Sequence, residues 1–219
     1  MAENQLMKSG HHATFEGDRA QEYVELQRKY MIKDFQHFAN QIVTKIKKGR
    51  ILHLGSGGGF LSIAIAQKSP EYTVVGLDSS RTMIELAEVN SSLSGVSSQI
   101  EFIYWDTLKL PVGDEDFDFA TSIWELHHWQ KPVSVLNEVF RVLKKGSRGM
   151  IIDLRRNTPE IELKKLTDNT PAFIYKGLKA HLPLTYFPIE IKDILLQTKF
   201  DEFQVEEEGV HVTISLYKK

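Results

Sequence analysis

The sequence predicts an α/β fold in which helices cover both faces of a mostly parallel sheet. Short apolar runs alternate with amphipathic segments through the middle of the 219-residue chain, a rhythm that is typical of β-α-β units. A glycine-rich turn, residues 55–59, joins the first apolar run to the helix that follows it. Two alternating runs separated by Glu208-Gly209 come last and predict an antiparallel hairpin. We therefore expect one doubly wound domain, large enough to bury a substantial core.

The expected elements follow one another in a regular order. Apolar residues at helical spacing predict two helices within 18–48, and Gly49 ends them. The expected parallel strands are 51–54, 73–77, 100–104, 117–122 and 149–154, and the hairpin strands are 200–207 and 210–217. The remaining expected helices are 60–68, 80–91, 132–143 and 189–198.

Two segments lie outside this alternation. Residues 1–48 are predicted to form an N-terminal helical lid on a second unit, residues 49–219, that carries the sheet. Residues 155–188 contain several prolines and the aromatic-rich stretch PAFIYKGLKAHLPLTYFP. This segment is too long and too apolar for an ordinary connection, so it is predicted to form a helical cap.

The composition argues against several classes of protein. The chain has 27 basic and 29 acidic residues, a net charge of −2, and no dense positive field of the kind expected for a dedicated nucleic-acid binder. It has no cysteine, which excludes disulfides and thiolate chemistry and fits a reducing compartment. No apolar run approaches the ~20 residues of a membrane span, and MAENQLMKSGHH has no signal-peptide core. We expect a cytoplasmic monomer or homodimer that binds neither membrane nor nucleic acid.

The glycine-rich turn and an acid at the end of the next strand predict a nucleoside site. Gly55, Gly57 and Gly59 can adopt positive φ and let a ligand approach the backbone closely. The helix that begins behind them offers unpaired N–H groups. Asp78 ends the second apolar run, where its carboxylate can accept hydrogen bonds from two ribose hydroxyls. A helix N-cap is the structural alternative for Asp78.

The glycine spacing indicates which nucleoside is bound. A dinucleotide site usually has the pattern G-x-G-x-x-G, but Phe60 stands at the position of its last glycine. The G-x-G-x-G pattern, its strand and Asp78 resemble motifs I and II of class I S-adenosylmethionine-dependent methyltransferases. This resemblance implies S-adenosyl-L-methionine as the cofactor. It also implies a Rossmann-like, doubly wound, mostly parallel seven-stranded sheet with a C-terminal antiparallel hairpin.

A second stretch of sequence indicates a particular group within these methyltransferases. Residues 117–153 resemble the small-molecule methyltransferases that include the ubiquinone and menaquinone C-methyltransferases. The markers are Asp116-Phe117-Asp118, Leu126-His127-His128, Arg141-Val142-Leu143-Lys144 and Gly146. The similarity covers Arg50 to Asp153, about half of the chain. It implies methyl transfer by in-line displacement to C, N or O of a small, partly apolar acceptor.

The resemblance also implies roles for single residues. Its cofactor-binding candidates are His53, Gly55, Ser56, Gly57, Gly59, Asp78, Ser79, Met83, Asp106, Thr107, Ile123 and Tyr23. Its candidates for a general base, where the acceptor needs one, are His128, Glu125 and Asp153. These last three follow strands at the carboxyl edge of the sheet, where open α/β sheets bind ligands.

Several of these residues have a structural alternative. Packing in the core is the alternative for His53, Met83 and Tyr23, and a turn is the alternative for Asp106. Asp153 could instead cap locally or pair with one of the two arginines that follow it.

Several other sites and functions compete with this interpretation. Adjacent histidines, such as His127 and His128, are expected to point in different directions, so without a third ligand no metal site is expected. A nicotinamide-dependent oxidoreductase also uses a glycine turn and an acid, but Phe60 argues against it. A nucleic-acid amino-methyltransferase would carry Asn/Asp-Pro-Pro-aromatic where this chain has residues 122–125. A non-catalytic S-adenosylmethionine sensor or partner subunit shares the glycine motif and stays open.

Overall fold

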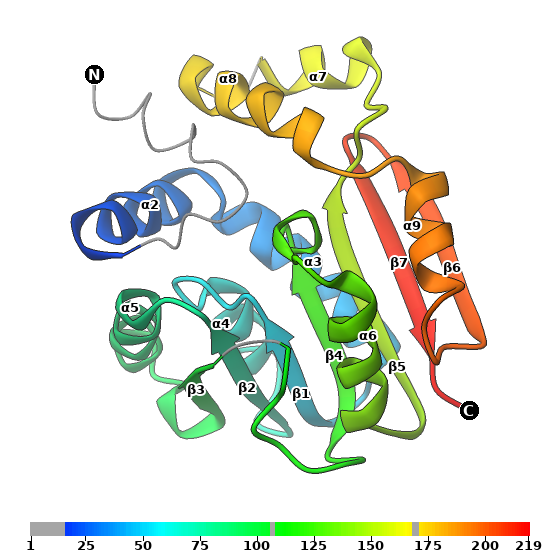
Figure 1. Cartoon of the computed structure of the whole chain (residues 1–219). Helices are drawn as coiled ribbons and strands as arrows, with labels where there is room; N and C mark the ends of the chain where they lie inside the picture. The colour runs from blue at the N-terminus through cyan, green and yellow to red at the C-terminus, as the bar shows by residue number, and fades with distance from the viewer. Residues whose placement is uncertain (1–15, 106–107, 168–170) are drawn as a thin grey trace.

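A seven-stranded sheet with the order β3-β2-β1-β4-β5-β7-β6 forms the centre of the molecule (Figure 1). This computed structural model describes residues 16–105, 108–167 and 171–219. The strands are β1 (Gly49–Leu54), β2 (Tyr72–Asp78), β3 (Ile100–Tyr104), β4 (Phe117–Ile123), β5 (Leu143–Leu154), β6 (Glu202–Glu208) and β7 (His211–Tyr217). The strands β1 to β5 pair in parallel, whereas β7 runs antiparallel to both β5 and β6. The predicted mostly parallel sheet with a terminal hairpin is confirmed.

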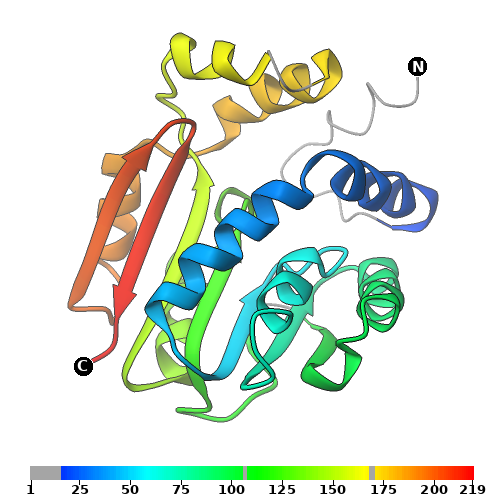
Figure 2. The same ribbon diagram turned by 180° about the vertical axis from the view of Figure 1, so that it is seen from behind.

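Helices cover both faces of the sheet, as the two views show (Figures 1 and 2). The α-helices are α2 (Gly17–Tyr30), α3 (Ile32–Lys45), α4 (Phe60–Ala66), α5 (Arg81–Leu93), α6 (Pro132–Val142), α7 (Glu160–Thr167), α8 (Ala172–His181) and α9 (Pro188–Leu195). Short 3-10 turns are η1 (Ser97–Gln99), η2 (Leu126–His128) and η3 (Leu182–Leu184). In the part of the chain described, no helix has the length and apolar character needed to cross a bilayer.

Strand residues alternate between two hydrophobic cores, because successive side chains point to opposite faces of a sheet. On one face, Leu52 and Leu54 of β1 pack in a cluster with residues of α6 and α9. On the other face, Ile51 packs in a cluster with residues of α3 and α4. Within the segment predicted as an N-terminal lid, α3 therefore contributes directly to the core of the sheet.

The predicted helical cap is formed by α7 and α8, which lie beyond the carboxyl ends of β4 and β5 (Figure 1). A small separate cluster holds it there, with Leu163 of α7 and Leu182 of η3 buried beside Leu154 and Val210. The cap thus covers the edge of the sheet where ligands are expected.

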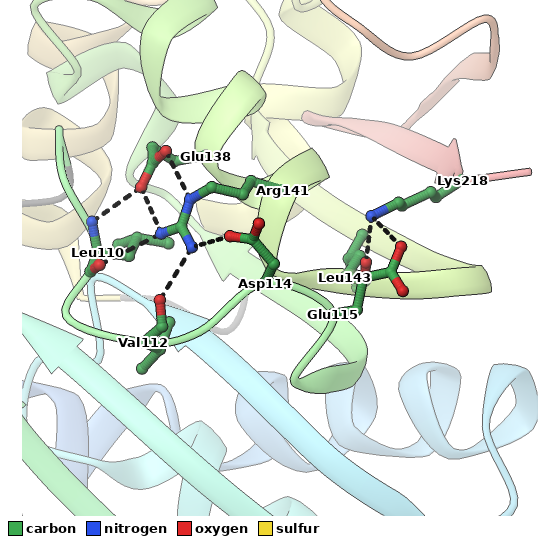
Figure 3. Close-up of polar contacts among 8 residues, drawn as sticks. All are labelled: Leu110, Val112, Asp114, Glu115, Glu138, Arg141, Leu143 and Lys218. Atoms are coloured by element: carbon green, nitrogen blue, oxygen red, sulfur yellow. Dashed lines mark hydrogen bonds and ion pairs between the residues drawn. The ribbon is translucent and has the colours of Figure 1, made fainter.

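Arg141 holds the loop before β4 in place (Figure 3). Its guanidinium donates to both carboxylate oxygens of Glu138, at 2.9 and 2.7 Å. It also donates to the Val112 carbonyl at 2.9 Å and to Asp114 Oδ1 at 2.8 Å. Glu138 in turn accepts the Leu110 N–H at 3.0 Å. The arginine of the Arg141-Val142-Leu143-Lys144 run therefore has a structural role, since its rigid fork of donors fits this set of acceptors.

Candidate active site

The turn between β1 and α4 adopts the backbone conformation that its glycines allow. Gly55, Gly57 and Gly59 have φ values of 69°, 51° and 81°, a region that residues with a Cβ rarely adopt. The Ser56 N–H donates to the Leu77 carbonyl at 2.9 Å, which ties the turn to β2. A fixed, largely buried stretch of backbone without Cβ atoms at its three glycines therefore lies beside the carboxyl end of β1.

Asp78 joins this turn to the beginning of α5. Its Oδ2 accepts the Gly57 N–H at 2.8 Å, and its Oδ1 accepts the Ser80 N–H at 2.9 Å. Burial raises the pKa of the Asp78 carboxyl, and these backbone hydrogen bonds oppose that rise. The N-cap of α5 is Ser80, whose Oγ accepts the Met83 N–H at 3.0 Å. A carboxylate has about four acceptor sites, so Asp78 can still accept from a ligand.

The Glu125 side chain lies against the backbone of Gly55. A Cβ built on Gly55 would lie 2.6 Å from Glu125 Cγ and 2.9 Å from Oε2. Trp124, which precedes Glu125, has φ 57°, and its ring packs against Phe35 and Phe38 of α3 at centroid distances of 5.6 Å. A non-glycine residue in this region marks strained backbone of the kind found at functional sites.

Two acidic side chains, Asp78 and Glu125, lie beside the glycine turn. Burial raises the pKa of Glu125 well above its ordinary value, and the nearby Asp78 and Asp153 raise it further. Burial, followed by the charge of Glu125, raises the pKa of Tyr23 to about 12, while a hydrogen bond with Gln27 acts in the opposite direction. A site with this balance favours a ligand that brings positive charge.

Two buried polar atoms at the turn point to a ligand. Within the described residues, Ser56 Oγ and Gln27 Oε1 are buried and have no hydrogen-bond partner. The Gln27 amide lies 3.7 to 3.8 Å from the position that a Cβ on Gly57 would take. Leaving such atoms unpaired costs about 1–3 kcal/mol of free energy each. A hydrogen-bond donor from a bound molecule would remove this cost.

Gln27 is a residue that sequence reasoning missed. It lies one helical turn after Tyr23 on α2, so both side chains share one face of that helix. This spacing is the signal that could have identified it.

Two of the predicted cofactor ligands lie in the core. His53 is 3% exposed, and its Nδ1 is hydrogen-bonded to Ser62 Oγ at 2.8 Å. Burial lowers the pKa of His53 to about 3, so its imidazole is neutral near pH 7. Met83 is also 3% exposed and packs in the cluster that contains α3 and α4. Both correspond to the core-packing alternative.

Two further residues predicted to bind the cofactor lie at or directly after the carboxyl ends of β2 and β4. Ser79 is exposed beside Asp78, and Ile123 is buried at the last position of β4. Asp106 and Thr107 lie outside the described residues.

Asp153, at the end of β5, binds His127. Its Oδ1 and Oδ2 lie 2.8 and 3.0 Å from His127 Nδ1, and Oδ2 also accepts the His127 N–H at 2.9 Å. Asp153 is 1% exposed. The expected alternative of an arginine partner is wrong, because Arg155 and Arg156 pair instead with glutamates of β6 and α9.

The expectation that His127 and His128 point in different directions is also wrong. Their ring centroids are 4.0 Å apart, and both rings contact His181 at the end of α8. The two residues lie in the 3-10 turn η2, and side chains alternate strictly only in a strand. His181 could not be predicted here, because the sequence does not give the position of the cap.

The fold and the glycine turn with its acid together define a class I methyltransferase domain. A family model described as "Methyltransferase domain" matches residues 45–201, well over half of the chain. The chain therefore belongs to this family, whose cofactor is S-adenosylmethionine, as the sequence predicted.

Curated relatives match part of the chain. A demethylmenaquinone methyltransferase of Thermotoga maritima is 31% identical over 114 residues, which are 52% of this chain and 47% of that protein. The ubiquinone/menaquinone biosynthesis C-methyltransferase UbiE of Geotalea daltonii is 28% identical over 134 residues, 61% of this chain and 56% of that protein. The chain thus spans about half the length of the curated relatives it matches.

Solved structures confirm the fold. A putative S-adenosyl-L-methionine-dependent methyltransferase of Methanococcus maripaludis has a TM-score of 0.77 at 19% identity, over 96% of this chain and 97% of its own. The plantazolicin methyltransferase BpumL, solved in complex with SAH, has a TM-score of 0.72 at 13% identity, over 100% of this chain and 96% of its own.

Proposed function

We propose that this chain transfers a methyl group from S-adenosylmethionine to C, N or O of a small, partly apolar acceptor. The observation that carries the proposal is the Asp78 carboxylate, held by the N–H groups of Gly57 and Ser80 beside a turn of three left-handed glycines. This arrangement offers a fixed acid for a ribose and a bare backbone for close approach. The family membership of the chain supports the same conclusion.

The residues around the turn can be assigned to parts of the cofactor. Asp78 would hold the ribose hydroxyls through charge-assisted hydrogen bonds. Ser56 Oγ and Gln27 Oε1 would accept from the amino end of the methionine portion, because both are buried acceptors at the turn. Glu125 and Tyr23 lie on the same side, where a carboxylate would stabilise a sulfonium or an ammonium group.

Methyl transfer from a sulfonium requires the nucleophile, the methyl carbon and the sulfur to be nearly collinear. Positioning can supply much of the rate in such a reaction. The glycine turn would hold the cofactor in a fixed position, and the cap would cover the side from which the acceptor approaches. Of the three general-base candidates, Asp153 is engaged by His127, Glu125 faces the glycine turn, and His128 is half-buried beneath the cap. Of the three, we therefore propose that His128 faces the acceptor.

The relatives give a first set of acceptors to test. Their names refer to demethylmenaquinone and to ubiquinone biosynthesis. Such quinone precursors are partly apolar molecules, and their ring hydroxyls and ring carbons are nucleophilic. Both properties agree with the proposed acceptor.

Incubation with methyl-labelled S-adenosylmethionine and a panel of quinone precursors, phenols and amines tests the proposal. We expect label in an acceptor and equimolar S-adenosylhomocysteine. Cofactor binding without turnover on any acceptor or on a metabolite extract would instead support a sensor or partner subunit. Binding of NADH in place of S-adenosylmethionine would overturn the assignment of the cofactor.

A further inference from the structure

Three histidines meet beneath the cap, at the carboxyl edge of the sheet. His127 and His128 come from η2, and His181 comes from the last position of α8. Each offers a ring nitrogen within 4.8 Å of the other two. The ring centroid of His181 is 6.0 Å from that of His127 and 6.2 Å from that of His128.

Imidazole nitrogens are the ligands that zinc and neighbouring divalent metals favour. Three protein nitrogens and one open position are typical of catalytic zinc sites, as opposed to closed four-ligand structural sites. His127 is buried and the other two residues are half-buried, so a bound ion would be shielded but still accessible to a small molecule.

Asp153 supplies a second feature of metal sites. A carboxylate can only accept hydrogen bonds, so its contacts of 2.8 and 3.0 Å with His127 Nδ1 place the proton on that nitrogen. Nε2 of His127 is then the nitrogen with a lone pair for a metal. Metal-binding histidines commonly have such a carboxylate on their other nitrogen, which fixes ring orientation and raises basicity.

We propose that His127, His128 and His181 bind one divalent metal ion of the zinc class, with Asp153 positioning His127. The ion would link the cap to the end of β4, and its open position would face the acceptor. Binding of the metal does not depend on the proposed function. Only the role given to the metal in the reaction rests on it.

The role follows from the chemistry of the acceptor. His128 then acts as a metal ligand and not as a general base: a hydroxyl oxygen bound to the ion loses its proton to a solvent base, because a metal lowers the pKa of a bound O–H group. The oxygen then bonds to the methyl carbon as the carbon–sulfur bond breaks, and that electron pair stays on sulfur. The products are a methyl ether and uncharged S-adenosylhomocysteine, so the charges balance.

Zinc titration of the chelator-treated full chain tests the site. We expect one Zn²⁺ per chain, and Co²⁺ in its place should show the visible absorption of a tetrahedral complex. The variants His128→Ala and His181→Ala should each weaken zinc binding at least about tenfold. His37→Ala, an exposed histidine of α3, is the matched control and should leave binding unchanged. Asp153→Asn should weaken binding about 10- to 100-fold.

Two results would overturn the proposal. One is the absence of stoichiometric zinc binding by the wild-type chain, and the other is equal zinc binding by the wild type and the double variant His128→Ala/His181→Ala. Binding of S-adenosylhomocysteine to each variant, with circular dichroism, verifies that the fold is intact. The metal-free protein should still bind S-adenosylhomocysteine, so failure of the metal site and failure of the cofactor site give different results.

Discussion

The Glu125 side chain occupies the space in front of Gly55 that a Cβ would need, with its Cγ 2.6 Å from the ideal Cβ position. The glycine is thus required both by its φ of 69° and by its neighbour. In the proposed function, the same contact places a carboxyl group beside the methionine portion of the cofactor.

Replacing Gly55 by alanine should weaken binding of S-adenosylhomocysteine at least about tenfold, because Glu125 must move toward the cofactor. Titration calorimetry measures the effect. Gly95→Ala is a close control, since Gly95 has φ 71° but no heavy atom within 4 Å of its ideal Cβ. Both variants carry similar backbone strain, so only Gly55→Ala should lose affinity. Equal affinities would show that the contact has no bearing on the ligand.

Affinity for S-adenosylmethionine should rise with pH over the range in which Glu125 loses its proton. The pKa of Glu125 is raised by burial and by Asp78 and Asp153, so the free protein keeps a proton there above the ordinary range. A sulfonium favours the ionised form and expels that proton, and so binding strengthens as pH increases. Calorimetry in buffers of different ionisation enthalpy counts the proton released. Glu125→Gln should abolish the release, and an unchanged proton count in this variant would refute the assignment.

Acid should destabilise the protein partly through His53. Burial lowers its pKa to about 3 in the folded state, against 6.5 for the free side chain. The folded state therefore prefers the neutral ring, and this contribution is complete above pH 6.5 and is lost as pH falls from there toward 3. By about pH 4 the loss should be on the order of 3 kcal/mol.

The variant His53→Gln separates this effect from other titrations, because glutamine can bind Ser62 without titrating. Urea unfolding at several pH values should show a shallower loss of stability for this variant. Parallel curves for variant and wild type would mean that His53 does not carry the effect.

Arg141→Ala should lower the free energy of unfolding by about 1–3 kcal/mol. The change removes the guanidinium donor from the Val112 carbonyl and from the Glu138 carboxylate, which keeps only the Leu110 N–H. Arg141→Lys should have a smaller effect, since one ammonium replaces part of the fork. Chemical denaturation measures both variants, with Lys192→Ala, at an exposed site of α9, as the control. A loss no larger than that of the control would exclude the structural role.

The parallel sheet, the hairpin and the cap could be predicted because their signals are local. Apolar runs such as Ile51 to Leu54 and the glycine spacing need no knowledge of the distant chain. The environment of His53 could not be predicted in the same way, because its partner Ser62 depends on how α4 packs on β1. The cluster of His127, His128 and His181 depends on where the cap rests, a long-range relationship that no local spacing encodes.

Titration of S-adenosylhomocysteine into the wild-type chain and into Asp78→Ala measures whether the Asp78 carboxylate holds the cofactor. We predict one site per chain in the wild type and an affinity lower by about 10- to 100-fold in the variant, the loss of one or two charge-assisted hydrogen bonds. Failure of the wild type to bind below millimolar concentration, or equal binding by both proteins, would contradict this role of Asp78.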